Sequence, residues 1–226
     1  MSFTFELSQI SGLIDLKRYR AILCLDGYLP DPEFILRLEL PVIAADGAAN
    51  QLISQGVAPD VVIGDLDSVD YELLARLNCV RIDDQDSSDF QKAITYMRPR
   101  ELLPCIILGM TGGYADHILN NISIFNDCDE SIFLTPSMLG QKLTQNDNFS
   151  FPLNTKLSVF GFPKGIITTK GLRWNLTKSQ LEFCGINSCF NRTVSETFSV
   201  TIHSGSVLLL TYLEGIIDAG AQGRTP

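Results

Sequence analysis

Short apolar runs alternate with helix-like segments over the first half of the chain, and this alternation constrains the fold more than any other feature. The strand-like runs lie at residues 21–25, 40–45, 61–64, 79–82, 105–108 and 132–135. Helix-like segments begin at residue 31 and lie at 46–55, 69–77, 88–97 and 116–125. Alternation of this kind predicts an α/β fold, a doubly wound and mostly parallel sheet with helices on both faces and right-handed crossovers.

Helix-start signals agree with this division. Asp31 is a favourable N-cap, and Pro32 suits the first helical position. Asp46 is expected to cap the next helix, which Gly56 ends.

Beyond about residue 136 the pattern changes to short runs rich in β-branched and aromatic residues. They lie at residues 157–160, 165–169, 172–176, 193–202 and 207–213. The segment 203–206 separates the last two as a hairpin turn would, and no helix fits apart from a turn near residues 178–183. This half is predicted to be a small all-β sandwich. The polar stretch between Pro136 and Asn154 holds the boundary, so we expect domains at residues 1–140 and 141–226.

The net charge and the cysteines limit the binding partners and the compartment that we expect for this protein. A net charge of −9 disfavours nucleic acid and favours a cationic second substrate, while ATP can still bind if divalent ions bridge the charges. Six cysteines without a CxxC pair indicate reduced thiols in a cytoplasmic protein. No apolar run is long enough to span a bilayer and the amino terminus lacks a signal-peptide pattern, so no membrane partner is expected.

Four acid-bearing turns follow the apolar runs. They lie at residues 46–50, 64–68, 84–89 and 112–117. Because ligands of open α/β sheets bind beyond the carboxyl ends of the strands, these turns are expected to gather carboxylates at one edge. Carboxylate oxygens are the ligands that Mg²⁺ prefers, so the sequence points to metal-assisted phosphoryl chemistry.

The turns at 64–68 and 84–89 carry the strongest candidates. Asp65 and Asp67 flank Leu66, and in an extended turn both carboxylates would point the same way; the alternative is an Asx-turn. Asp89 lies in the first turn of a helix and is a further candidate ligand, although capping explains at least one acid of its group. Lys92 either reaches phosphate oxygens or pairs with Asp89.

The remaining candidates are individually weaker. Gly112 and Gly113, after Thr111, either let the backbone approach a phosphate or simply form a turn. Asp116 is either a helix cap or a ribose or metal contact.

In the second half, Trp174 is the only tryptophan of the chain, either a core residue or a flat face for stacking. Ser188 and Asn191, in a predicted loop, either bind a ligand or are solvated.

In order, these motifs resemble those of the thiamin pyrophosphokinase family, over residues 21–210. The family's Asp-Gly-Gly-Ala-Asn resembles residues 46–50, and its Pro-Asp-x-x-x-Gly-Asp-x-Asp-Ser is intact at 59–68. Its Asp-Gln-Asp-x-Thr-Asp, Gly-Gly-Arg-x-Asp-His and Thr-x-Gly-Leu-Lys-Trp/Tyr motifs are similar to residues 84–89, 112–117 and 169–174.

The resemblance implies transfer of the pyrophosphoryl group of ATP to the hydroxyl of thiamin, giving thiamin diphosphate and AMP. It implies Mg²⁺ ligands and catalytic residues at Asp46, Asp65, Asp67 and Asp89. It implies ATP contacts from Ser68, Lys92, Thr111, Gly112, Gly113 and Asp116. Thiamin contacts would come from Asn50, Gln85, Trp174, Ser188 and Asn191. It also implies a homodimer with active sites between the subunits.

Three positions depart from the family pattern. Tyr114 replaces an arginine, Phe190 replaces the second serine of a Ser-x-Ser-Asn loop, and Arg173 replaces a lysine. Two other functions remain open: an aspartate-nucleophile phosphatase, which the residues after Gly64 also resemble, and a nucleotide- or thiamin-binding sensor without catalysis.

Overall fold

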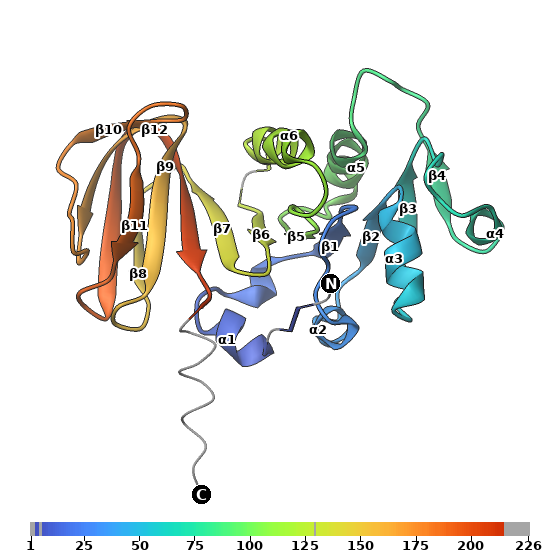
Figure 1. Ribbon diagram of the computed structural model, residues 1–226, viewed down its shortest axis with the longest axis horizontal. Coiled ribbons are helices and arrows are strands. Elements are labelled where there is room, and N and C mark those ends of the chain that lie inside the picture. The colour runs from blue at the N-terminus through green and yellow to red at the C-terminus, as the bar shows by residue number, and fades with distance from the viewer. Residues whose placement is uncertain (1–2, 5, 129, 215–226) are drawn as a thin grey trace, which may run out of the picture. The chain divides into compact units, whose positions relative to one another are not determined.

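The computed structural model describes residues 3–4, 6–128 and 130–214 and divides them into two compact units (Figure 1). The first takes the described residues up to Leu7 and those from Lys17 to Pro136; the second takes Ser8–Leu16 and those from Ser137 onward. The first unit therefore ends within the stretch where the sequence changes pattern.

The first unit contains a parallel sheet in the order β6-β5-β1-β2-β3-β4. Its strands are β1 (Ala21–Cys24), β2 (Val42–Ala45), β3 (Val61–Gly64), β4 (Cys79–Arg81), β5 (Cys105–Leu108) and β6 (Ile132–Leu134). β1, β2, β3 and β5 are buried along their whole length, which explains why they are continuous apolar runs.

Helices cover both faces of this sheet. They are α2 (Pro32–Arg37), α3 (Ala48–Ser54), α4 (Tyr71–Leu74), α5 (Asp89–Met97) and α6 (Ala115–Phe125), with a 3₁₀ turn, η2 (Arg98–Arg100). Two short helices, α1 (Leu7–Ser11) and η1 (Leu16–Arg18), precede β1. Figure 1 shows α5 and α6 on the side of the sheet opposite α2 and α3. The predicted doubly wound α/β architecture is confirmed. No helix in the described part of the chain is both long and apolar enough to cross a membrane.

Local signals account for the starts of α2 and α5. The Asp31 carboxylate accepts a hydrogen bond from the Glu33 amide (2.9 Å), with Pro32 at the first helical position of α2. α5 begins with a capping box between Ser88 and Gln91. The expectation that Asp46 caps α3 is wrong. Gly47 is the N-cap and makes no side-chain cap bond, while Asp46 adopts a φ of 42° that directs its carboxylate elsewhere.

The second unit is an antiparallel sandwich built around two long, bent strands. Its strands are β7 (Met138–Leu143), β8 (Asp147–Ser150), β9 (Lys156–Lys170), β10 (Ser179–Glu182), β11 (Ser188–Arg192) and β12 (Thr197–Tyr212). The first part of β9 pairs with β11 and with the last part of β12, and that part of β12 also pairs with β7. The last part of β9 pairs with β10 and with the first part of β12, and that part of β12 also pairs with β8. Apolar side chains from both halves form one core that includes Phe149, Val159, Leu181, Phe198 and Leu209. The predicted β sandwich is confirmed as a fold class.

Several element predictions in this half are wrong. The segment 203–206 is no hairpin turn, because β12 continues through it with two register shifts. Gly205 has a φ of 69° and packs against the Lys164 carbonyl, so the glycine serves a bulge instead of a chain reversal. Residues 172–176 form a loop with one isolated bridge, and the predicted turn near 178–183 contains β10. The predicted loop with Ser188 and Asn191 is β11. The stretch in which we expect the domain boundary holds β7 and β8, and the boundary itself stays a prediction.

Candidate active site

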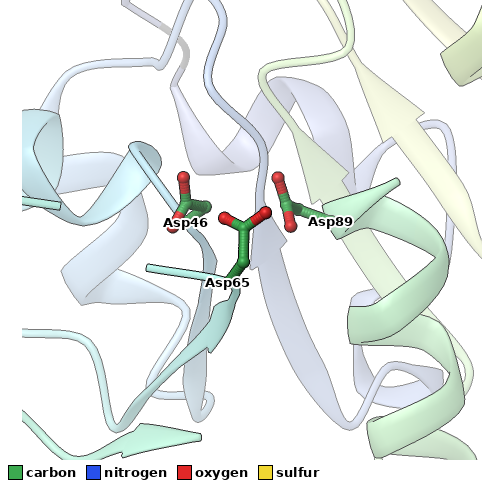
Figure 2. Close-up of side chains that lie close together, drawn as sticks. All are labelled: Asp46, Asp65 and Asp89. Carbon is green, nitrogen blue, oxygen red and sulfur yellow. The ribbon is translucent and has the colours of Figure 1, made fainter. Parts of the chain in front are cut away.

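Three carboxylates meet at the carboxyl edge of the parallel sheet. Asp46 follows β2, Asp65 follows β3, and Asp89 is the first residue of α5. One carboxylate oxygen of each lies within 4.8 Å of the others, and Figure 2 shows the three side chains close together. Because Ser88 caps α5, Asp89 is not needed as a cap and its carboxylate is available to the cluster.

Asp46 is the buried member of this cluster. It is only 4% exposed, and its Oδ2 accepts a hydrogen bond from the Ser68 amide (3.2 Å). Its Oδ1 is buried without a hydrogen-bond partner. Burial raises the pKa of Asp46, and the charges of Asp89 and Asp65 raise it further against the effect of the Ser68 bonds. An orphaned buried carboxylate oxygen facing two further carboxylates is a donor set that fits a divalent cation.

Lys92 supplies positive charge beneath the cluster. Its Nζ lies 3.0 Å from Asp89 Oδ1 and 3.7 Å from Asp65 Oδ2, and its side chain is 3% exposed. Burial opposes the charge of Lys92, but Asp89 and Asp65 outweigh it and raise the pKa of the ammonium. A hydrogen bond from Gln85 Nε2 (3.1 Å) is the main cause that lowers the pKa of Asp65. Of the two roles predicted for Lys92, the structure contains the ion pair with Asp89.

Gly64 makes room for the cluster. A Cβ on this residue would lie 2.8 Å from the Asp46 Cβ, 3.0 Å from Asp46 Oδ1 and 3.1 Å from Asp89 Oδ1. The absence of a side chain at the end of β3 is therefore a condition for Asp46 and Asp89 to approach each other.

Asp67 and Asn50 lie outside this cluster. Leu66 has a φ of 66°, so the turn is not extended, and Asp67 is exposed with its Oδ1 accepting a hydrogen bond from the Ser68 hydroxyl (3.0 Å). Asn50 donates to the Ser68 carbonyl (2.8 Å) and accepts from the Asp70 amide (3.0 Å). Asn50 thus holds the turn that carries Asp67 and Ser68.

The turns after β1 and β5 meet where the strand order reverses. The Tyr28 amide donates to the Thr111 carbonyl (2.6 Å), and a Cβ on Gly27 would lie 2.2 Å from the Gly109 carbonyl oxygen. Gly112 and Gly113 have φ values of 120° and 79°, in the region that favours glycine. The crevice at such a reversal is the usual ligand position in open α/β sheets.

Two acidic residues lie next to these turns in the chain, Asp26 directly after β1 and Asp116 at the start of α6. Asp116 lies in the first turn of α6, where it accepts a hydrogen bond from the His117 amide (2.9 Å), while Tyr114 is the N-cap without a side-chain cap bond. Sequence reasoning did not single out Asp26, an exposed acid that accepts a hydrogen bond from Gln51 (2.5 Å) directly after β1. Its signal was the same as for the other turns, an aspartate after an apolar run.

The predicted thiamin contacts of the second unit lie around one loop. Trp174 is 55% exposed, with the Arg173 guanidinium 4.9 Å from its ring centroid. Asn191 is completely buried in β11, and Ser188 begins that strand. Phe190 is 60% exposed with a φ of 56° at a bulge, and its ring lies 5.6 Å from that of Tyr212.

An acidic cluster that suits a divalent cation, at the same edge of a doubly wound sheet as a glycine-rich turn, defines a site of the nucleotide-dependent phosphotransferase class. Comparison with known proteins identifies the family. Residues 37–133 match the thiamin pyrophosphokinase catalytic domain, and residues 148–209 match the thiamin pyrophosphokinase vitamin B1 binding domain. The chain belongs to the thiamin pyrophosphokinase family.

Individual relatives agree. Thiamine pyrophosphokinase 3 of Oryza sativa subsp. japonica is 30% identical over 208 residues, 75% of this chain and 77% of that protein. Thiamine pyrophosphokinase 1 of Arabidopsis thaliana is 27% identical over 220 residues, 81% of this chain and 82% of that protein.

Solved structures support the fold. The yeast thiamin pyrophosphokinase superposes with a TM-score of 0.76 at 17% identity, covering 96% of this chain and 93% of that one. The Bacillus subtilis enzyme gives a TM-score of 0.72 at 18% identity, covering 85% of this chain and 99% of that one.

Proposed function

We propose that this chain carries out the reaction of its family, transfer of the pyrophosphoryl group of ATP to the thiamin hydroxyl, giving thiamin diphosphate and AMP. Membership of the family supports the reaction. We assign the reaction to this site because Asp46, Asp65 and Asp89 meet at the carboxyl edge of the sheet.

Asp46, Asp65 and Asp89 would hold the metal, which we propose to be Mg²⁺. The orphaned Oδ1 of Asp46 and the all-oxygen donor set support this choice. A bound Mg²⁺ neutralises and orients the phosphate oxygens in reactions of this class. Asp67, outside the cluster, would orient ATP and accept the proton of the thiamin hydroxyl at a carboxylate oxygen.

The other residues of the first unit act on ATP by position and charge. Lys92 offsets the charges of the Asp65 and Asp89 carboxylates, so its effect on ATP would be exerted through these two residues. Gly112 and Gly113 let the backbone after Thr111 approach the nucleotide closely. Ser68 and Asp116 would add polar contacts along the nucleotide.

Thiamin would meet residues of the first unit of one chain and of the second unit of its partner. We propose the exposed Trp174 indole and the Ser188 hydroxyl as contacts, with Asn50 and Gln85 supporting the pocket through the bonds described above. We also propose a homodimer in which the second unit of one chain completes the site of its partner, as the family resemblance implies. A cytoplasmic protein is supported by six cysteines of which none forms a disulfide.

The test is chromatography of purified protein incubated with ATP, Mg²⁺ and thiamin. The proposal expects AMP and thiamin diphosphate in equal amounts. ADP or free phosphate as the nucleotide product would contradict it. Omission of Mg²⁺ with a chelator present should abolish both products.

The two alternative functions have weaker support. An aspartate-nucleophile phosphatase carries its loop after the first strand, whereas Asp65 follows β3. A non-catalytic sensor draws only on Tyr114 and Phe190, and it would bind ATP and thiamin without forming AMP. The family match favours the kinase over both.

A further inference from the structure

Four hydrogen bonds engage the whole side chain of Asn191. Its Oδ1 accepts from the Trp174 amide (3.2 Å) and from the Arg192 amide (2.9 Å). Its Nδ2 donates to the Trp174 carbonyl (2.7 Å) and to the Ser188 hydroxyl oxygen (3.2 Å). A carboxamide offers two lone pairs and two N–H groups, so no hydrogen-bonding capacity remains for a ligand. The residue is also 0% exposed.

Both backbone polar groups of Trp174 end on this one side chain. The amide and the carbonyl of Trp174 face the oxygen and the nitrogen of the Asn191 carboxamide, and this orientation is the only one in which donors meet acceptors. The indole itself is 55% exposed. The tryptophan is therefore fixed at its base while its ring stays accessible.

The rest of the loop is held by separate bonds. The Leu176 amide donates to Thr169 Oγ1 (2.8 Å), and the Leu172 amide donates to Asn175 Oδ1 (3.1 Å). The Arg173 amide donates to the Arg192 carbonyl (2.8 Å), which ties the residue before the tryptophan to β11. The two hydrogen bonds described above for the Trp174 backbone itself both go to Asn191, so the orientation of this residue depends on that side chain.

We infer that Asn191 is a positioning residue, which fixes Trp174 so that the indole is a preformed platform for thiamin and which does not itself contact the ligand. The inference rests on the proposed function for the role of Trp174 as a thiamin contact. A platform ordered before binding saves the entropy of ordering it when thiamin arrives. Asn191 also orients the Ser188 hydroxyl, because its Nδ2 donates a hydrogen bond to the hydroxyl oxygen. The Ser188 O–H can then still donate to the ligand.

The test uses Trp174 as a spectroscopic reporter, since it is the only tryptophan in the chain. We would compare Asn191→Ala with Asn187→Ala in the full chain without ligand. Asn187 is a matched control in the same unit, because it also bonds backbone groups, accepting from Gly161 (2.9 Å) and donating to Glu182 (3.0 Å).

The expected result is specific to one variant. Asn191→Ala lowers the fluorescence anisotropy of Trp174 and increases its quenching by acrylamide, whereas Asn187→Ala changes neither. Thiamin binding then weakens by about five- to tenfold in Asn191→Ala, the effect of one or two net hydrogen bonds. The affinity for Mg²⁺·ATP stays within about twofold, because the hydrogen bonds of Asn191 end on Trp174, Ser188 and Arg192, none of which is a proposed ATP contact.

Two results would overturn the inference. One is a folded Asn191→Ala variant whose tryptophan anisotropy and quenching equal those of the wild type. The other is weakened thiamin binding with an unchanged tryptophan signal, which would make Asn191 a direct ligand contact.

Hydrogen exchange on the wild type decides the matter if the variant does not fold. The Trp174 amide should be protected although its side chain is exposed, and exchange at the rate of a free loop amide would contradict the inference. Both ligand-free measurements are independent of the reaction. A wild type that binds no thiamin would refute the proposed function and leave the positioning result standing.

Discussion

Replacement of Asp46 by asparagine should make the metal-free protein more stable and remove its response to Mg²⁺. Asp46 is 4% exposed, and its carboxylate lies within 4.8 Å of those of Asp65 and Asp89. Two unit charges at that separation repel by about 3.5 kcal/mol at an effective dielectric constant of about 20. Lys92 and the Ser68 amide offset part of this repulsion. We therefore expect Asp46→Asn to gain about 1–3 kcal/mol, or about 3–8 °C in Tm.

The effect has a defined pH dependence. The pKa of Asp46 is raised by folding, so the protonated carboxyl is favoured in the folded state and stability is lost as pH rises through that pKa. Asparagine does not ionise, so the Asp46→Asn variant does not lose this stability. The difference in Tm between variant and wild type should thus grow as pH rises above the ordinary value of 3.8 and disappear as pH falls toward it.

The assay is thermal unfolding with EDTA or with Mg²⁺. At about 100 times its dissociation constant a ligand stabilises the folded state by about 2.7 kcal/mol, which the wild type should gain and Asp46→Asn should not. Asp83→Asn is the charge-matched control, since Asp83 pairs with Arg81 on the surface and its side chain is 73% exposed. A lower metal-free Tm for Asp46→Asn with an intact Mg²⁺ response would refute the reasoning and make Asp46 only an acceptor for Ser68.

Three further changes test other parts of the molecule. Gly64→Ala keeps every carboxylate but forces Asp46 and Asp89 apart. The Mg²⁺ affinity, measured by calorimetry, should therefore fall about 10- to 100-fold. An unchanged affinity would show that the cluster tolerates a Cβ at this position. Tyr114→Arg, at a residue 78% exposed, should lower the KM for ATP several-fold with a change in Tm below about 2 °C, and an unchanged KM would place residue 114 away from the phosphates. Phe190→Gly removes the backbone strain of a φ of 56°, which stabilises the fold by about 1 kcal/mol, and it loses a ring contact that contributes about the same. The free energy of unfolding, measured by urea titration, should therefore change by less than about 1 kcal/mol. A loss of several kcal/mol would show that the Phe190 ring is a core element.

The first unit was predictable because its signals are local. A strand buried on both faces is a continuous apolar run, as in β3, and a helix start such as Asp31-Pro32 is complete within three residues. The parallel arrangement then brings the strand ends to one edge, which is why Asp46, Asp65 and Asp89 could be grouped in advance. The separate position of Asp67 could not be predicted, because it depends on the left-handed backbone of Leu66.

The second unit was less predictable because its strands are defined by their partners. Gly205 lies within a polar segment that is typical of a turn, yet in the structure it accommodates a bulge against the Lys164 carbonyl. A bulge and a hairpin turn use the same residue types, and only the pairing of β9 with β12 over their whole length distinguishes them.

The same limit applies to the polar residues that match family motifs. Asn50, Gln85 and Asn191 were all predicted as thiamin contacts, and each uses its side chain on the protein itself. Asn50 holds the turn that carries Asp67, Gln85 lowers the pKa of Asp65, and Asn191 holds Trp174. A motif requires a residue type wherever the geometry of a site would fail without it, whether or not that side chain meets the ligand. Substitutions at these three positions should therefore act through the residue that each one holds, which makes the Trp174 signal and the ionisation of Asp65 the observables that separate positioning from contact.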